Sequence, residues 1–172
     1  MANKVFLDTN IILDDLFDDR ECSKVSQELL DKYLKEDTVF VINDLSLNNL
    51  FYIGAKKDFY KIFNFMKDIS FNNPMWEVYT LTNKDYKEIY DFMDKNDYKN
   101  FEDLQQYIAA RNCGCKFIIT NDNDDFPKLD IPLIRTNPKF ENYTPENKTE
   151  NTQAQEKKGV VDNIINFVRK NK

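Results

Sequence analysis

Acidic residues follow two short apolar runs that lie far apart in this chain. Asp8 comes directly after Val5-Phe6-Leu7, and Asp122 follows Phe117-Ile118-Ile119-Thr120, with Asp103 at the start of a helical pattern before the second run. If both runs are parallel strands of one sheet, their carboxyl ends meet at one edge. Carboxylates crowded there repel one another, and a divalent cation relieves that cost. Such a site can activate a metal-bound water against a phosphodiester.

Each of these acids also has a purely structural explanation. Asp8 could cap the helix that follows it, as Asp commonly does. Asp103 stands three residues after Asn100, like the acidic partner of a capping pair. Asp122 and Asp125 belong to an acidic stretch that could form a tight Asx turn. Their shared position at strand ends and at the start of a nearby helix favours one common site.

Alternating strands and helices are expected to position these acids. The sequence predicts strands at residues 4–7, 38–42, 76–79, 117–120 and 132–135. Apolar residues at helical spacing fill the segments between the first four strands, where we expect six helices. This alternation is typical of a parallel sheet covered by helices on both faces.

The composition excludes several classes of enzyme. The chain has no histidine, so Ser-His-Asp or Cys-His catalysis and His-ligated metals are excluded. With only three glycines, it contains no P-loop and no dinucleotide-binding fingerprint. Cys22, Cys113 and Cys115 lack zinc-site spacing and are predicted to be reduced thiols. The remaining ligand atoms are oxygens, which suit Mg²⁺ and Mn²⁺.

The charge balance restricts the way in which this protein could contact nucleic acid. It carries 24 basic and 30 acidic residues, a net charge of −6, whereas general nucleic-acid binding depends on basic patches. It could still act on nucleic acid if cations neutralise the acidic centre and local lysines hold the backbone. Lys56, Lys57 and Lys61 are the candidates for RNA binding, although such a cluster is also typical of a solvated helix face.

The chain is predicted to hold one domain and a distinct C-terminal segment. Residues 1–140 form the domain, residues 141–158 read as a polar linker, and residues 159–172 have the pattern of an amphipathic helix. That helix is too short to be stable alone, so it must dock on its own domain, a second copy or another protein. No run approaches the length of a membrane helix and no signal region is visible, so we expect a cytoplasmic protein without a membrane segment.

Residues 4–140 resemble the PIN-domain ribonuclease family in the order and spacing of four motifs. Val5-Phe6-Leu7-Asp8-Thr9-Asn10 is similar to the opening strand and Asp-Thr-Asn signature of that family. Phe101-Glu102-Asp103-Leu104-Gln105 is similar to its acidic helix start, and Phe117 to Asp122 to its last acidic strand end. The later Asp125-Phe126 also fits the pattern.

The resemblance implies a fold and an activity. The fold is a three-layer α/β/α sandwich with a four- to five-stranded, mostly parallel central sheet, and the activity is Mg²⁺- or Mn²⁺-dependent hydrolysis of RNA. Many bacterial members are toxins of toxin–antitoxin pairs and dimerise, so an antitoxin protein and a second copy are expected partners. Carried over by position, the catalytic metal ligands are Asp8, Asp103 and Asp122, and Asp125 is either a further metal ligand or a residue that supports one. The residues expected to support the site are Thr9, Asn10, Asn49 and Thr120.

Two departures from the family pattern keep an alternative open. Asn49 stands where the family usually has Glu, and Asn100 stands where relatives often have Asp. An amide oxygen can bind a metal but brings no negative charge, which predicts weaker metal affinity and one ion rather than two. The alternative is a catalytically weak PIN-like module that binds RNA or a protein partner. An aspartyl-phosphate phosphotransferase is disfavoured, because Asn10 stands where a second acid is needed.

Overall fold

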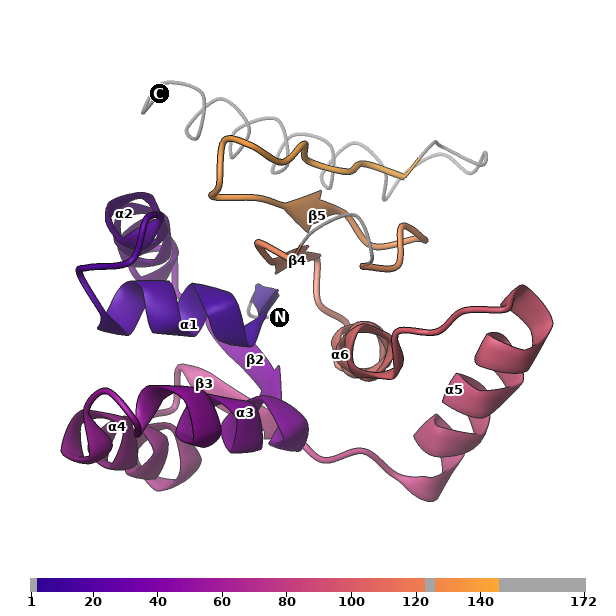
Figure 1. The fold of residues 1–172 in the computed structure, drawn as a ribbon, viewed down its shortest axis with the longest axis horizontal. Coiled ribbons are helices and arrows are strands. Elements are labelled where there is room, and N and C mark those ends of the chain that lie inside the picture. Colours follow the sequence, from indigo (N-terminus) through magenta and orange to yellow (C-terminus); the bar gives the residue numbers. More distant parts are fainter. Residues whose placement is uncertain (1–2, 123–125, 146–172) are drawn as a thin grey trace.

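The computed structural model describes residues 3–122 and 126–145 (Figure 1). In this part of the chain five strands form one sheet in the order β3-β2-β1-β4-β5, and every pairing between neighbouring strands is parallel. The strands are β1 (Lys4–Leu7), β2 (Val39–Asn43), β3 (Trp76–Tyr79), β4 (Phe117–Ile119) and β5 (Leu133–Ile134). The predicted central sheet is therefore confirmed, and it is wholly parallel among these strands.

Helices cover both faces of the sheet. Over the described residues they are α1 (Thr9–Leu16), α2 (Ser23–Leu34), α3 (Asp44–Gly54), α4 (Phe59–Phe71), α5 (Asn83–Asn96) and α6 (Phe101–Asn112). Figure 1 shows α1 to α4 on one side and α5 with α6 on the other. Val5 and Leu7 of β1 pack in a cluster with the first group of helices, and Phe6 packs with the second. This alternation, which follows from the two-residue repeat of a strand, confirms the three-layer α/β/α sandwich.

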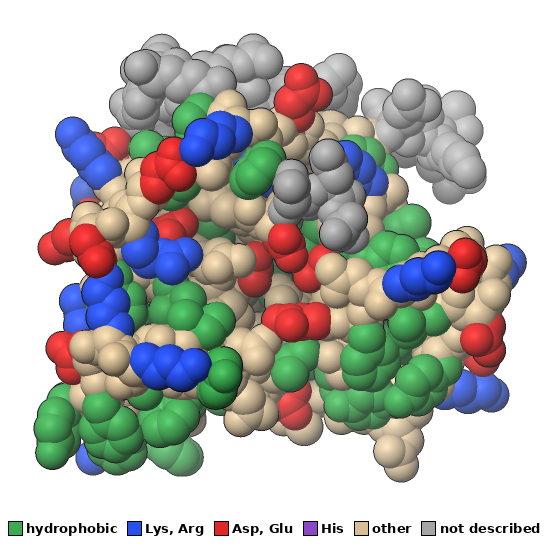
Figure 2. Space-filling view, in the orientation of Figure 1, with side chains coloured by type: hydrophobic (Ala, Val, Ile, Leu, Met, Phe, Trp, Pro, Cys, Tyr) green, Lys and Arg blue, Asp and Glu red, His purple; other side chains and the backbone are tan. Residues whose placement is uncertain are grey.

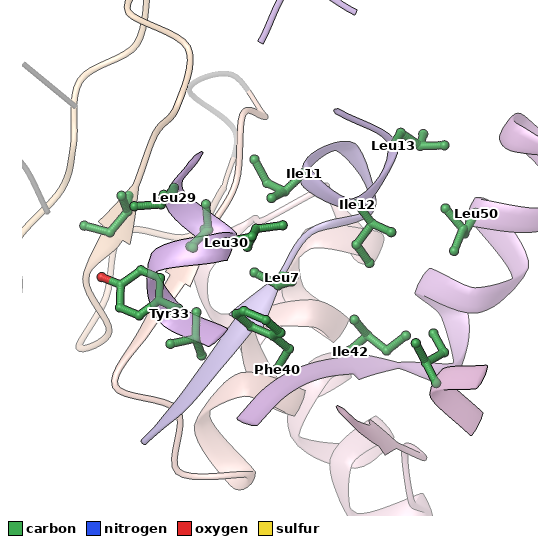
Figure 3. Packing of buried hydrophobic residues seen from close by; sticks show 14 of the residues in the cluster. Leu7, Ile11, Ile12, Leu13, Leu29, Leu30, Tyr33, Phe40, Ile42 and Leu50 are labelled. Carbon is green, nitrogen blue, oxygen red and sulfur yellow. The ribbon is translucent and has the colours of Figure 1, made fainter. Parts of the chain in front are cut away.

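The larger core cluster fixes the first helix against the sheet (Figure 3). Ile11 of α1, Leu29 of α2 and Leu50 of α3 are fully buried beside Leu7. Burial of one such side chain contributes about 1.5–3 kcal/mol, so the cluster holds α1 firmly in place. The start of α1, and Asp8 immediately before it, is therefore positioned by core packing.

Polar caps define where two of the site helices begin. The Asn43 side chain accepts a hydrogen bond from the Ser46 backbone N–H at 2.8 Å and caps α3. Asn100 accepts one from the Asp103 N–H at 3.2 Å and caps α6. Gly114, just past the end of α6, has φ +70°, a left-handed conformation that glycine adopts without strain. Both caps place a helix start next to the carboxyl edge of the sheet.

The predicted C-terminal division lies largely outside the described residues. Beyond β5, Tyr143 forms an antiparallel bridge with Leu133, with both N–H···O distances at 2.9 Å. The linker at 141–158 and the helix at 159–172 therefore stay predictions. Among the described helices, none is both long enough and apolar enough to cross a membrane. Cys22, Cys113 and Cys115 are unpaired thiols, as predicted.

Candidate metal and catalytic site

The ends of β1 and β4 meet at one edge of the sheet. Leu7 is paired with Ile119, and the Asp8 backbone N–H donates to the Ile119 carbonyl at 3.0 Å. One residue further on, the Thr120 hydroxyl donates to Asp8 Oδ2 at 2.8 Å and accepts from the Asp122 N–H at 3.0 Å. Thr120 thus connects the two acids that stand far apart in the sequence.

Asp8 is a buried acid at the N-cap position of α1. It is 4% exposed, and its backbone carbonyl accepts from the Ile11 and Ile12 N–H groups at 3.0 and 3.4 Å, so the residue caps α1 while its carboxylate belongs to the acidic cluster. Burial raises the pKa of Asp8 to about 6, and the charge of Asp122 raises it further, against hydrogen bonds from Thr120, Gln106 and the Asn10 backbone that lower it. The ionised form of the Asp8 carboxyl is therefore less favourable in the folded protein than in water.

Asp103 joins the same electrostatic cluster from α6. The residue is 3% exposed, and the Asn100 amide donates to its Oδ2 at 2.5 Å. Burial raises the pKa of Asp103 to about 8, with further contributions from the charges of Asp122, Asp8 and Glu102 and from a hydrogen bond with the Asp122 side chain. Asp103 is thus both the acidic partner of the Asn100 cap and a member of the acidic cluster. The capping role and the site role predicted for it are therefore compatible.

A fourth acid, Glu102, lies next to these three. Its pKa is raised by partial burial and by the charge of Asp122, while a hydrogen bond from Asn49 lowers it. The Asn49 amide donates to Glu102 Oε1 and so connects α3 to α6. Glu102 was not among the predicted metal ligands, although its place beside Asp103 was visible in the sequence. Asn49 lies at the site as expected, and it contacts an acid there.

Two further buried residues support the site, and neither was predicted from the sequence. Gln106 is one turn after Asp103 and hydrogen-bonds Asp8 across from α6. Gln106 follows Asp103 by three residues, a spacing that places two side chains on one face of a helix. This spacing could have predicted from the sequence that Gln106 lies at the site. Arg135 is buried after β5, and its Nη1 donates to the Thr120 carbonyl at 3.1 Å. Arg135 therefore braces the strand end from which Thr120 reaches Asp8.

Thr9 and Asn10 lie beside Asp8, in different environments. The Thr9 hydroxyl is buried and has no hydrogen-bond partner among the described residues. The Asn10 side chain accepts a hydrogen bond from Arg20 at 3.5 Å, and Arg20 also bonds buried Asp14 at 2.5 Å. Asn10 thus connects the start of α1 to the loop before α2, and the role of both residues at the site stays a prediction.

Two of the three lysines predicted to bind RNA, Lys57 and Lys61, lie at the end of α1 opposite Asp8. Lys57 pairs with Asp19, and Lys61 donates to the Leu16 carbonyl. Leu16 is about 12 Å along α1 from Asp8, at 1.5 Å per helical residue. Lys56 lies over the Tyr52 ring at 3.7 Å. Their role in RNA binding stays a prediction, and so does that of Asp125, which lies outside the described residues.

The oxygen atoms of this cluster suit a hard divalent cation. Figure 2 shows acidic side chains gathered near the middle of this face. Within residues 3–122 and 126–145, no three acidic or cysteine side chains are arranged as a ready ligand set. However, the oxygens of Thr9 and Gln106 are buried without a partner in the described part of the chain, and a cation would cancel the repulsion that raises the pKa of Asp103. The donor chemistry therefore fits Mg²⁺ or Mn²⁺.

Comparison with known proteins agrees with this fold. A family model described as the PIN domain matches residues 5–132, so the chain belongs to the PIN domain family. Ribonuclease VapC1 of Aquifex aeolicus (strain VF5) is 28% identical over 138 residues, which cover 78% of this chain and 92% of that protein.

Solved structures at lower identity share the same architecture. VapC20 of Mycobacterium tuberculosis, described as a Sarcin-Ricin loop cleaving toxin, superposes with a TM-score of 0.58 at 13% identity, over 70% of this chain and 92% of that one. A chain of a toxin-antitoxin complex from Klebsiella pneumoniae superposes with a TM-score of 0.53 at 18% identity, over 71% and 89%. At these identities the likeness concerns the fold.

Proposed function

We propose that this protein is a toxin-type endoribonuclease that hydrolyses RNA phosphodiester bonds with a divalent metal ion. The observation that carries the proposal is the cluster of Asp8, Asp103 and Asp122, which three separate segments bring to one edge of the sheet. A fold gains no stability from crowding buried acids, so a cluster of this kind indicates a functional site. Membership of the PIN family and the similarity to Ribonuclease VapC1 support RNA as the substrate.

Asp8, Asp103 and Asp122 would hold Mg²⁺ or Mn²⁺, with Asp125 as a further ligand. Such an ion supplies a water of lowered pKa and stabilises charge that develops on the phosphate. The Thr120 hydroxyl fixes one oxygen of Asp8, and the Asn100 amide fixes one oxygen of Asp103. These hydrogen bonds orient the acids before any ligand arrives, which reduces the reorganisation that binding requires.

The neutral Asn49 determines how strongly the site holds metal. It adds no charge, but its amide positions the Glu102 carboxylate near Asp122. Because α3 carries the neutral Asn49, it adds no negative charge to the site. We propose that Glu102 of α6 supplies negative charge in its place, and that the site binds one ion with reduced affinity. Thr9 and Asn10 would steady the start of α1, and Lys56, Lys57 and Lys61 would contact RNA beyond the site.

We propose a cognate antitoxin protein and a second copy of the chain as partners, in the cytoplasm. One of the superposed structures is a toxin-antitoxin complex, which supports a protein partner. Exposed aromatic side chains on α3 and α4 offer apolar surface of the kind that protein partners cover. They are Phe51, Tyr52, Phe59, Tyr60 and Phe63, which are 40–74% exposed. Figure 2, drawn in the orientation of Figure 1, shows hydrophobic side chains gathered at the lower left, where α4 lies.

The test of the enzymatic proposal is cleavage of single-stranded RNA by the purified full chain. We expect cleavage with Mn²⁺ or Mg²⁺, no cleavage in EDTA, and loss of at least about 100-fold in rate for Asp8→Asn, which keeps an oxygen to accept from Thr120. A charge-matched control, Asp94→Asn, changes an exposed acid on α5. RNA binding without metal-dependent cleavage would favour the alternative, a catalytically weak binding module.

A further inference from the structure

Asp14 of α1 is a buried acid that does not belong to the acidic cluster. The residue is 4% exposed, and both of its carboxylate oxygens accept hydrogen bonds. Oδ1 accepts from Arg20 Nε at 2.5 Å, and Oδ2 accepts from the Asn121 amide at 3.1 Å. Arg20 lies between α1 and α2, and Asn121 directly precedes Asp122. Asp14 therefore connects α1 to the end of β4, next to a proposed metal ligand.

The hydrogen bonds of the Asn121 side chain fix its orientation. Its oxygen accepts from the N–H groups of Thr136 and Asn137, both at 2.9 Å. Its nitrogen donates to Asp14 and, at 2.7 Å, to the Thr136 hydroxyl. An amide side chain has two donor and two acceptor positions, and all four are used here. Asn121 is thus held between α1 and the segment after β5, and the backbone that it fixes leads directly into Asp122.

Arg20 extends this connection to Asp8. Its Nη2 donates to Asn10 Oδ1 at 3.5 Å, and the Asn10 backbone N–H bonds the Asp8 carboxylate. Two routes of hydrogen bonds therefore join Asp8 to Asp122. The short route passes through Thr120 alone. The long route passes through Asn10, Arg20, Asp14 and Asn121.

Stability alone is a poor explanation of the ion pair in the long route. The Asp14 side chain is 5% exposed and that of Arg20 is 33% exposed. Burying a carboxylate costs desolvation free energy, which a bond to one cation largely offsets and seldom exceeds. By contrast, residues that hold metal ligands from behind are often decisive, because their loss typically reduces metal affinity or activity about 10- to 100-fold.

We propose that Asp14 and Arg20 are positioning residues that hold Asp8 and Asp122 at the separation a metal ion requires. Asp14 acts through Asn121, and Arg20 acts through Asn10. Neither residue needs to contact the ion or the RNA. The inference rests on the proposed ribonuclease function, and it adds that metal affinity depends on an acid that is not itself a ligand.

The first test replaces Asp14 by Asn in the full chain. An amide at position 14 has one oxygen, so it can accept from Arg20 or from Asn121 but not from both. We expect Mn²⁺ binding about tenfold weaker in calorimetry, and kcat for RNA cleavage at least about tenfold lower with KM within about twofold of wild type.

The matched control is Asp85→Asn, which changes an equally buried acid on α5. Asp85 accepts hydrogen bonds from the Thr82 hydroxyl and from the Asn112 amide, so this variant also loses bonds to a buried carboxylate. We expect Asp85→Asn to be destabilised in urea unfolding as much as Asp14→Asn or more. Its Mn²⁺ affinity and kcat should nevertheless stay within about twofold of wild type.

The second test exchanges the two bonded groups. In Asp14→Asn/Asn121→Asp, the amide at position 14 can donate to a carboxylate at position 121 while its oxygen accepts from Arg20, and the net charge equals that of wild type. The Thr136 hydroxyl can rotate to donate where it now accepts. We expect Mn²⁺ affinity and kcat to recover to within about threefold of wild type, although each single variant is impaired. Such non-additivity is the signature of a direct contact.

Two results would overturn the inference while wild type binds Mn²⁺ and cleaves RNA. One is an Asp14→Asn variant whose Mn²⁺ affinity and kcat match those of Asp85→Asn. The other is an exchange variant whose losses equal those of the two single variants combined. If wild type neither binds Mn²⁺ nor cleaves RNA, the proposed function itself fails, and this inference fails with it.

Discussion

Replacing Asp103 by Asn should make the metal-free protein more stable while it abolishes RNA cleavage. Asp103 is buried beside Asp8 and Asp122, which raises its pKa to about 8. An Asn side chain is neutral at every pH, and its oxygen can still accept the hydrogen bond that the Asn100 amide donates. The variant therefore keeps the local contacts and removes the repulsion.

The size of the gain follows from the two pKa values. In the unfolded chain the carboxyl has its ordinary pKa of 3.8, and in the folded protein it has about 8. At pH 7 the folded protein keeps a proton that the unfolded chain has released. Holding that proton costs up to about 4 kcal/mol, at about 1.36 kcal/mol for each pH unit above the ordinary value. We expect a gain in the free energy of unfolding of about 1–4 kcal/mol.

The direction of the pKa shift determines how the stability of the protein changes with pH. Because the pKa of Asp103 is higher in the folded protein than in the unfolded chain, the folded protein binds more protons between about pH 4 and pH 8, and its stability falls as pH rises through that window. Urea unfolding in EDTA should therefore show a gain for Asp103→Asn that is several times larger at about pH 7.5 than at about pH 4.5. Asp94→Asn, an exposed control on α5, should show almost none. A variant less stable than wild type at the higher pH, or a gain equal at both values, would refute this reasoning.

Three other predictions concern the same site. Thr120→Val removes the hydroxyl that bonds Asp8 and the Asp122 N–H, and should cost about 1–2 kcal/mol in urea unfolding together with at least about tenfold in cleavage rate; an unchanged rate would contradict it. Glu102→Gln should raise the Mn²⁺ dissociation constant about tenfold in calorimetry, because it removes a charge beside the cluster; equal affinity would show that Glu102 plays no part. The apparent Mn²⁺ affinity should rise from about pH 5 to about pH 8, because Asp8 and Asp103 must lose protons to bind metal; a flat profile would count against these ligands.

Much of the fold was predictable because its signals are local. β1 and β4 are short apolar runs that end at polar residues, and each was expected within one residue of its observed bounds. The alternation of strands with helices indicated a parallel sheet, and a parallel sheet brings the ends of neighbouring strands to one edge. The approach of Asp8 to Thr120 follows from that rule, although residues 9–119 separate them in sequence.

The contacts of the site that were not predicted from the sequence depend on how the helices pack against one another. The contact between Asn49 and Glu102 joins α3 to α6, and the contact from Gln106 to Asp8 joins α6 to the end of β1. No local pattern encodes the distance between two helices that pack on different parts of a sheet. The lysines show the same limit, because the helical pattern placed Lys57 on a surface and only tertiary packing directs it to Asp19.

The most direct test of the metal site is a crystal of the full chain soaked in Mn²⁺ and measured at the manganese absorption edge. We expect anomalous density within coordination distance of Asp8, Asp103 and Asp122. The same crystal of Asp8→Asn should show weaker density or none. Density at another place, or none in wild type under conditions in which it cleaves RNA, would contradict the proposal that these carboxylates hold the catalytic ion.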